Sequence, residues 1–507
     1  MSSGSSPTST TYLEKRDVEL AAATQKNEIP AHVYRTALWK VDLVVIPVVT
    51  MLCKFPVIPG KLHDYHDMTT TNFILAYVQD RANIGNAIVA GMTLSLRMSL
   101  HQVSVALTVT YVPYILMELP CNWVMKRIGA NITLPIMVIL WGVACTCQGA
   151  VTSYHGLIAC RFFLGLAEGG ILPGLILYLS SFYKREQLNL RVAFLFTATS
   201  LAGAFSGLLA AAISNMNGDR GKPGWAWIFI LEGVFTVVFG IFALFVMPRR
   251  PEDTFFLTEL EKEALIAQRD EWAINEEHHQ FTWAEVFSTF KEPHLWIMSI
   301  GLFFGGTCLY GLIYFTPSIV QSLGHSPNRS QLLSVPPYAA AFVVSLIAAY
   351  FSDRYRARGV VLIIFSCFMI IGYGMFLGSA KKHVDYGSLF FQVVGVYTAA
   401  PTISAWLANS FEPHFKRGTA IAWGYVITNC GGILSTWIFN DAPRYRKATK
   451  INLAFSVGIL VATIVCIFYL RNENAKKRKW RAANDLSALQ SDTTKLGDRH
   501  PHFEYTL

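Results

Sequence analysis

The sequence predicts an all-α membrane protein with twelve transmembrane helices in two pseudo-symmetric bundles of six. The composition is 53% hydrophobic and only 15% charged over 507 residues, which is too little polar surface to cover a soluble protein of this length. Apolar windows of about 20 residues, long enough to cross a hydrocarbon core of about 30 Å as a helix, recur along most of the chain. A single long polar connection divides these windows into six and six.

The apolar windows give the expected helices in chain order. The first six cover residues 38–79 with an interruption, 100–120, 131–150, 156–180, 190–213 and 225–247. The second six cover residues 295–318, 331–351, 359–378, 386–407, 418–439 and 451–470. We therefore expect an N-terminal bundle over residues 36–247 and a C-terminal bundle over residues 294–471.

Three polar segments flank and separate the two bundles. Residues 1–35 are rich in Ser and Thr without an apolar core, so we expect a disordered cytosolic tail and not a signal peptide. Residues 248–293 form the central connection, expected to be a cytosolic loop, and contain the surface-helix pattern "TELEKEALIAQRDEW". Residues 472–507, which contain the basic run "KKRKWR" at 476–481, are expected to form a basic cytosolic tail.

The distribution of positive charge predicts the orientation. An even number of spans places both termini on one side, and the loops on that side carry roughly twice as many Lys and Arg residues as the opposite loops. Both termini are therefore expected in the cytosol, with the protein in the plasma membrane. The net charge of +9 follows from this topology. Because the basic residues are spread over loops, we expect no nucleic-acid partner.

The stretch "RFFLGLAEGG" places Arg161 and Glu168 inside the fourth apolar window. A charge at the centre of a membrane helix costs about 2.5–3.5 kcal/mol, so each should face a bundle interior or a wet cavity. Seven positions are two helical turns, which puts both residues on one face about 10 Å apart along the axis, too far for a direct ion pair. Each therefore either pairs with a fixed charge on another span or serves a transported molecule. The glycines at 165, 169, 170 and 174 indicate close helix packing.

A second acid and base stand together in "YVQDRANIGNA", residues 77–87, as Asp80 and Arg81. Two such sets in the N-terminal half suit a carrier that binds an anion with arginines and a proton with carboxylates near the membrane midplane. Two further acids, Glu118 and Glu232, lie near the ends of predicted spans. We expect these two to anchor helix ends.

Enzyme, metal and cofactor chemistry are not expected from this sequence. No P-loop, Ser-His-Asp or His-Glu-His pattern is present. The nine cysteines lie in or beside apolar segments and are expected to pack as small hydrophobic residues. Cys145 and Cys147 have no histidine or carboxylate near them in sequence that would complete a metal site.

Several motifs together resemble those of a known family. The six-plus-six pattern, the central loop, "FSDRYRARG" at 351–359, "DRANIGNA" and "RFFLGLAEGG" look like the major facilitator superfamily, specifically its anion:cation symporter branch. Within that branch the sequence most closely resembles the fungal allantoate permease family, whose members take up nicotinate, pantothenate, biotin, ureido acids and similar carboxylates. The resemblance covers residues 36–472. The fifth window lacks the Gly-Pro motif of drug:proton antiporters, which disfavours an exporter.

The resemblance implies proton-coupled uptake of a small organic anion by a monomer that alternates its access. In this branch the matching acids, Asp80 and Glu168, are proton sites, and the matching arginines, Arg81 and Arg161, attract the substrate. Residues near the expected cavity are candidate substrate contacts, although ordinary helix packing is an equal alternative for each: Asn83, Tyr310, Tyr314, Asn409 and Asn429. The expected gating loops contain Lys126, Arg127, Asp353 and Arg354, with Lys126 where the general superfamily pattern has Asp.

The first apolar window is interrupted by "CKFPVIPGKLHDYHDMTTTNF", residues 53–73. Pro56, Pro59 and Gly60 would break a helix there, and deleting the segment would restore a nearly full crossing before Asp80. The first two residues of the segment, Cys-Lys, can be encoded as TGTAAG, which contains the splice-donor sequence GTAAG. Our hypothesis is therefore that the segment is a retained intron translated in frame. The alternative is a genuine re-entrant or extracellular insertion. A product that keeps the segment would be inactive under the intron hypothesis.

Two other functional classes remain open on the sequence alone. A non-transporting nutrient sensor or inactive paralogue would keep the same fold without moving a substrate. An uncoupled facilitator would move the anion without a proton. The tail carries no recognisable signalling module, which favours a carrier.

Overall fold

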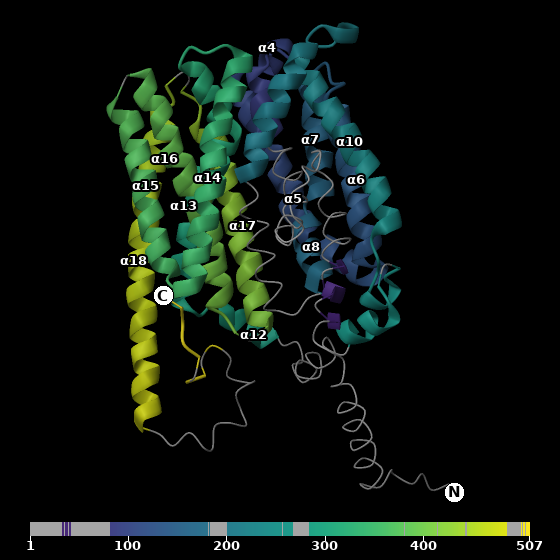
Figure 1. Cartoon of the computed structure of the whole chain (residues 1–507). Helices are drawn as coiled ribbons and strands as arrows, with labels where there is room; N and C mark the ends of the chain where they lie inside the picture. The colour runs from purple at the N-terminus through teal and green to yellow at the C-terminus, as the bar shows by residue number, and fades with distance from the viewer. Residues whose placement is uncertain are drawn as a thin grey trace, which may run out of the picture.

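Two groups of long helices stand side by side in the computed structural model (Figure 1). The structure describes residues 33–34, 36–38, 40–41, 82–180, 182, 200–255, 257–266, 283–379, 381–412, 414–441, 444–483, 498, 500–501 and 503–506. Residues 1–32 and 53–73, which carry the expected N-terminal tail and the interruption of the first window, lie outside the described residues.

The N-terminal half contains a helix over residues 82–89, the short α4 (Met92–Ser95) and five longer helices. The longer helices are α5 (Leu100–Ile128), α6 (Ala130–Gln148), α7 (Tyr154–Glu168), α8 (Ile171–Ser180) and α10 (Gly224–Val246), with a further apolar helix at Ser200–Met216. Helix α6 packs against α10 and α7, and α5 packs against α7. Helix α5 begins in a capping box, where Ser99 and Gln102 each accept the other's backbone N–H.

The C-terminal half contains six long helices. They are α13 (Pro293–Ser322), α14 (Pro327–Tyr355), α15 (Arg358–Gly378), α16 (Lys382–Asn409), α17 (His414–Ile438) and α18 (Arg446–Ala483). Helix α13 contacts α14, α16, α17 and α18, so it lies at the centre of this half. The predicted all-α membrane fold is confirmed: among the described residues, eight helices are long and apolar enough to cross a membrane.

The connection between the halves contains η5 (Pro251–Asp253), a helix over residues 259–266 and α12 (Trp283–Thr289). Lys40 Nζ lies 2.8 Å from Glu261 Oε1, which ties the start of the N-terminal half to this connection. Glu261 also accepts the Thr258 backbone N–H at 2.9 Å, as in an N-terminal cap. The ion pair therefore fixes one part of the connection against the N-terminal half.

Three helix boundaries differ from the sequence prediction. Helix α5 continues to Ile128 and is separated from α6 only by Gly129, whose φ of 107° turns the chain. The fourth window is two helices, because α7 ends at Glu168 and α8 begins at Ile171 after two glycines. Helix α18 runs on to Ala483, well past the apolar window that ends at 470.

Glycines set the spacing of α5 and α7, as the sequence predicted. A Cβ on Gly165 would fall on the Thr110 carbonyl oxygen, and a Cβ on Gly169 would fall on the Tyr114 carbonyl oxygen. The two helices therefore approach each other along their backbones. Both contacts advance in the same direction along the chain, so α5 and α7 run parallel.

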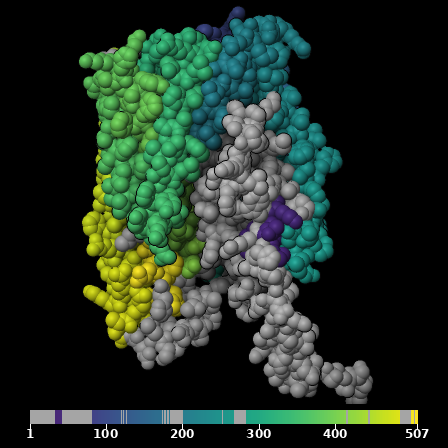
Figure 2. Space-filling view, viewed as in Figure 1, coloured from purple at the N-terminus to yellow at the C-terminus, as the bar shows by residue number. Residues whose placement is uncertain are grey.

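The two halves meet at the end of the molecule that carries α4, shown at the top of Figure 1. Thr108 Oγ1 lies 2.8 Å from Thr436 Oγ1, and Trp437 Nε1 donates to Thr108 Oγ1 at 3.0 Å. Ser104 Oγ donates to Asn440 Oδ1 at 3.2 Å. These contacts join the start of α5 to the end of α17, and we call these five residues the outer seal. In the space-filling view the halves are in contact along the upper part of this face (Figure 2).

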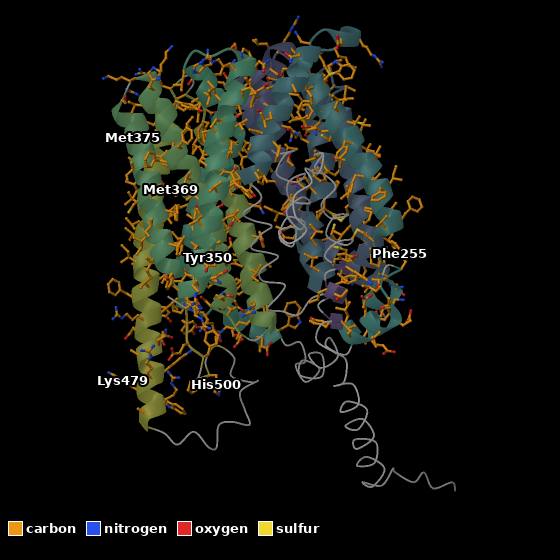
Figure 3. The ribbon with its side chains drawn as sticks, in the orientation of Figure 1. Phe255, Tyr350, Met369, Met375, Lys479 and His500 are labelled. Atoms are coloured by element: carbon orange, nitrogen blue, oxygen red, sulfur yellow. The ribbon has the colours of Figure 1, made fainter. Side chains whose placement is uncertain are left out.

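Large apolar side chains cover the outside of the helix groups. Phe245, Leu116 and Phe468 are 81%, 68% and 67% exposed. Exposed apolar groups of this size are unfavourable in water and are typical of surfaces that face lipid. Labelled Tyr350 on α14 is a further exposed example (Figure 3).

Candidate functional site

Arg161 lies inside the N-terminal half with its charge enclosed. Helix α7 positions it after the N-cap Ser153, whose side chain accepts the Gly156 N–H at 3.3 Å. The residue is 3% exposed, and its Nε and Nη2 atoms have no hydrogen-bond partner among the described residues. The guanidinium carbon lies 5.8 Å from the centroid of the Phe229 ring on α10. Two donors of a buried cation thus remain available for a ligand.

Glu168 is the last residue of α7 and is 1% exposed. The helix ends there because Gly169 and Gly170 follow, and glycine is a poor helix former. The seven-residue spacing from Arg161 places both charges within the N-terminal half, as the sequence predicted, two turns apart. A buried acid and a buried base therefore occupy separate levels of one helix.

The helix over residues 82–89 contributes a buried polar network. Asn83 Nδ2 donates to Glu232 Oε2 on α10, and Asn83 Oδ1 accepts from Ser206 Oγ at 3.0 Å. Asn86 Nδ2 donates to the same Ser206 oxygen at 2.8 Å. Gln331 of α14 donates to the Asn86 carbonyl at 3.2 Å, so the network reaches the C-terminal half. Both ends of the Asn83 amide are engaged here.

Tyr310, Tyr314 and Asn429 come together in a cluster that spans both halves. Tyr310 OH donates to Asn429 Oδ1 at 3.2 Å, and Tyr314 OH lies 2.8 Å from Tyr111 OH of α5. The Tyr111 and Tyr310 rings meet edge to face with centroids 5.5 Å apart. A Cβ on Gly85 would fall on the Tyr314 carbonyl oxygen, so the 82–89 helix also touches α13 here. We call Tyr111, Tyr310, Tyr314 and Asn429 the tyrosine cluster.

Asn409 lies elsewhere, at the last position of α16. Its side-chain oxygen accepts from both terminal nitrogens of Arg358, at 2.6 Å from Nη2. Arg358 also donates to the Ala405 carbonyl. The structure therefore separates Asn409 from the tyrosine cluster. Asn409 instead binds Arg358, the residue that stabilises the turn between α14 and α15.

The expected gating residues lie in helix ends. Asp353 and Arg354 belong to the last turn of α14, and Asp353 Oδ1 accepts from Arg358 Nη2 at 3.2 Å. Arg356 follows with φ of 51°, a left-handed conformation that reverses the chain. This ion pair thus closes the turn between α14 and α15.

The equivalent residues of the N-terminal half are Lys126 and Arg127, in the last turn of α5. The Arg127 guanidinium carbon lies 3.9 Å from the centroid of the Trp123 ring. Asp80 and Arg81, the second predicted acid and base, lie outside the described residues.

Two acids lie deeper in their helices than the sequence predicted. Glu118 is 8% exposed and lies well inside α5, because that helix continues to Ile128. Glu232 lies within α10 and accepts from Asn83. The expectation that both anchor helix ends is therefore wrong, and only a correct end for α5 would have revealed the position of Glu118.

The fold and this interior of charged and polar groups define a membrane transporter, and the comparisons identify its family. The sequence profile of the Major Facilitator Superfamily matches residues 72–436. The chain belongs to this superfamily, whose members are transporters and not enzymes.

Curated relatives from fungi cover most of the chain. An uncharacterised transporter of Schizosaccharomyces pombe is 33% identical over 477 residues, which are 93% of this chain and 90% of the relative. A high-affinity nicotinic acid transporter of Saccharomyces cerevisiae is 32% identical over 429 residues, 84% of this chain and 80% of the relative. These relatives agree with the predicted resemblance to fungal carboxylate permeases.

Solved structures share the fold at low identity. A bacterial homologue of the human lysosomal transporter Spinster, in an inward-facing and occupied conformation, has a TM-score of 0.59 at 13% identity, covering 78% of this chain and 96% of that one. A D-xylose-proton symporter has a TM-score of 0.58 at 16% identity, covering 78% and 97%. These similarities concern the fold alone.

Proposed function

We propose that this transporter takes up a small organic anion together with a proton, by alternating access. The anion is a carboxylate of the nicotinate type. The observation that carries the proposal is Arg161, a buried cation with two donors that no described residue binds. The similarity to a high-affinity nicotinic acid transporter at 32% identity supports the same class of substrate.

An arginine in this state favours binding of an anion. Burying a charge without a partner is costly, and an arginine at the centre of a membrane helix costs about 2.5–3.5 kcal/mol on insertion scales. A carboxylate bound by two parallel N–H groups of the guanidinium offsets this cost in a charge-assisted, planar geometry. The proposed role of Arg161, with Arg81 beside Asp80, is to provide this geometry for the substrate.

The proposed proton sites are Glu168 and Asp80. An ionised acid and an anionic substrate compete for the same positive field of the arginines. Substrate binding therefore favours the protonated acid, and protonation favours substrate binding by the same factor. This linkage couples uptake of the anion to the proton gradient. A loaded carrier with one net positive charge gains about 2.3 kcal/mol per 100 mV of membrane potential.

The tyrosine cluster is the proposed contact surface for the rest of the substrate. Tyr310 and Tyr314 stack with their ring centroids 6.3 Å apart, and their hydroxyl groups and Asn429 supply donors and acceptors between the halves. Aromatic faces suit a flat ring such as that of nicotinate. Asn83 is left out of this surface because Glu232 and Ser206 occupy its amide, and Asn409 because it binds Arg358.

The proposed working arrangement follows from the outer seal. Because α5 and α17 are closed against each other at one end, this arrangement supports a conformation in which the substrate site is reached from the other end, which faces the cytosol in this proposal. In this proposal both termini are cytosolic, the protein is a monomer in the plasma membrane, and the turns with Lys126, Arg127, Asp353 and Arg354 act in gating. The tight turn held by Asp353 and Arg358 supports the gating role.

An uptake screen tests the substrate class. Cells that express the full chain, and cells that express the form without residues 53–73, are given labelled nicotinate, pantothenate, biotin, allantoate and phthalate, and each carboxylate that enters is challenged with its uncharged amide. We expect uptake of at least one carboxylate and little competition from its amide. Uptake of none of the five, or equal competition by the amide, would contradict the proposal.

The arginine is tested by a matched pair of variants. Arg161→Lys keeps the charge but loses the planar fork, so we expect carboxylate uptake to fall at least tenfold, because charge-assisted hydrogen bonds contribute about 1.5–3 kcal/mol. Arg329→Lys, an exposed arginine of α14, serves as the control and should transport normally. Both rates are normalised to protein at the cell surface. Unchanged affinity in Arg161→Lys would remove the anion-binding role.

A further inference from the structure

Residues 498, 500–501 and 503–506, here called the tail segment, fold back against the inner end of the C-terminal half. Figure 3 labels His500 in this segment and Lys479 on α18, which lie at the same end of the molecule. The Asp498 backbone N–H donates to the Glu412 carbonyl at 3.1 Å. None of the transport roles proposed above uses these residues.

A buried charge cluster holds the start of the tail segment. The Lys416 ammonium donates to both carboxylate oxygens of Asp498 at 2.8 Å, and to Glu292 Oε1 at 2.9 Å. The side chains of Lys416 and Asp498 are only 4% and 2% exposed. Lys477 of α18 donates to the Asp498 carbonyl. Lys416 thus pairs with two carboxylates while Lys477 binds a backbone carbonyl, and removal of the tail segment would leave an excess positive charge.

Directional hydrogen bonds fix the register of the other end. The Asn474 amide donates to the Tyr505 carbonyl and accepts the Tyr505 N–H, both at 2.9 Å. The Trp406 indole of α16 donates to the Thr506 carbonyl at 2.8 Å. The Tyr505 ring is buried and meets the His294 ring of α13 with centroids 5.5 Å apart. A shift by one residue would break the paired Asn474 bonds.

Exposed ion pairs complete the contact. Glu504 accepts from Arg478 at 3.2 and 3.3 Å and also from Arg481. These hydrogen bonds lower the pKa of the Glu504 carboxyl, so it is ionised at cytosolic pH. Burial raises the pKa of Asp498, while Lys416 acts in the opposite direction. The acids of the tail segment therefore complement the basic run that ends α18.

The helices held by the tail segment are those that close the opposite end of the molecule. Helix α13 begins beside Tyr505 and carries Tyr314, which bonds to Tyr111 of the N-terminal half. Helix α17 carries Lys416 in its first turn and Thr436 of the outer seal near its end. A constraint at one end of a rigid helix limits its tilt at the other end.

We propose that the tail segment is an intramolecular ligand that latches the inner ends of α13, α16, α17 and α18 and so stabilises the state in which the outer seal is closed. This inference rests on the proposed alternating access but not on the identity of the substrate. A ligand that binds one of two states more tightly shifts their populations by its differential affinity. Release of the tail segment therefore favours opening of the outer seal.

Charge reversal releases and restores the latch without changing buried residues. Glu504→Arg places a third positive charge beside Arg478 and Arg481 and should undock the tail segment. Adding Arg478→Glu and Arg481→Glu restores complementary charge and should redock it. Glu259→Arg is the matched control, because it makes the same charge change at an 85% exposed acid of the central connection that pairs with Lys262.

Amide hydrogen exchange measures docking in the purified full-length protein. The Tyr505 N–H should be protected in the parent and in Glu259→Arg, should exchange rapidly in Glu504→Arg, and should regain protection in the triple variant. Rapid exchange at Tyr505 in the parent would overturn the inference. If the Tyr505 N–H stays protected in Glu504→Arg, the charge change has not undocked the segment. The residues after Ala483 are then deleted, which removes the segment entirely.

A cysteine introduced by Ser104→Cys reports opening of the outer seal through its reaction with a membrane-impermeant maleimide. The labelling of the same protein without this cysteine is subtracted as background. We expect labelling to rise about fivefold on undocking, since allosteric couplings are commonly 5- to 150-fold, and to return to the parent value in the triple variant. Labelling that does not change when the segment is undocked or deleted would overturn the latch. An equal rise in Glu259→Arg would overturn it as well. The uptake screen separately tests the proposed transport.

Discussion

Glu168 is the buried acid that we propose as a proton site, so its substitution distinguishes a symporter from a facilitator. Glu168→Gln imitates the protonated acid, so we expect substrate exchange across the membrane to continue while accumulation against a gradient fails. Counterflow and net accumulation are measured in the same cells. The control is Glu259→Gln, an 85% exposed acid of the central connection that should leave both activities intact. Normal proton-driven accumulation in Glu168→Gln would remove its assignment.

Individual residues differ in how far their sequence context predicts their place. Arg161 and Glu168 could be assigned to a protein interior because charges in an apolar, glycine-rich run are costly unless enclosed. Glu118 could not, because its environment depends on where α5 ends. Asn409 was also unpredictable, since its partner Arg358 comes from another helix. Local patterns report burial, while side-chain partners depend on tertiary contacts.

At the scale of helices, the contact between α5 and α7 depends on glycine. Gly165→Ala would drive a methyl group into the Thr110 carbonyl, so we expect a loss of about 1–3 kcal/mol of stability and a melting temperature lower by several degrees. The control is Gly374→Ala in α15, where a Cβ meets no atom within 4 Å and higher helix propensity should leave stability unchanged or improved. Thermal melts in one detergent compare them, and equal melting temperatures would contradict the packing role.

The interrupted first window leads to a prediction about the transcript. If residues 53–73 are a retained intron, messages should include a form that lacks their codons, and that form should be the active transporter. Sequencing of cDNA across the site, followed by uptake assays of both forms, provides the measurement. The intron hypothesis would be refuted if every transcript contained these codons and the long product showed full uptake.

The order of the helices could be predicted, but several of their ends could not. The length and hydropathy of each window identified α5, α6 and the six helices of the C-terminal half. The break at Gly169 and Gly170 was hidden because both residues lie within an unbroken apolar run. Helix α18 extended further than predicted because polar residues after the membrane window, such as Asn474 and Lys477, are held by the tail segment.

At the scale of the whole molecule, polar contacts close the two halves at one end while the tail segment ties helices at the other. Thr108, Thr436 and their neighbours form the closed end, with hydrogen bonds from both halves. No such pairing could be predicted from sequence, since the partners stand more than three hundred residues apart and belong to different halves. The family resemblance predicted the architecture of two six-helix halves. The contacts between the halves show at which end they are closed.

Uptake into proteoliposomes tests the central claim, proton-coupled entry of an organic anion, most directly. Purified protein is reconstituted, an acid-outside pH gradient is imposed, and a carboxylate found in the screen is supplied with equal concentrations inside and outside. The account predicts accumulation above the starting concentration, loss of that accumulation with a protonophore, and no accumulation in Glu168→Gln. Accumulation that persists with the protonophore, or a pH gradient that drives no accumulation of the carboxylate, would contradict it.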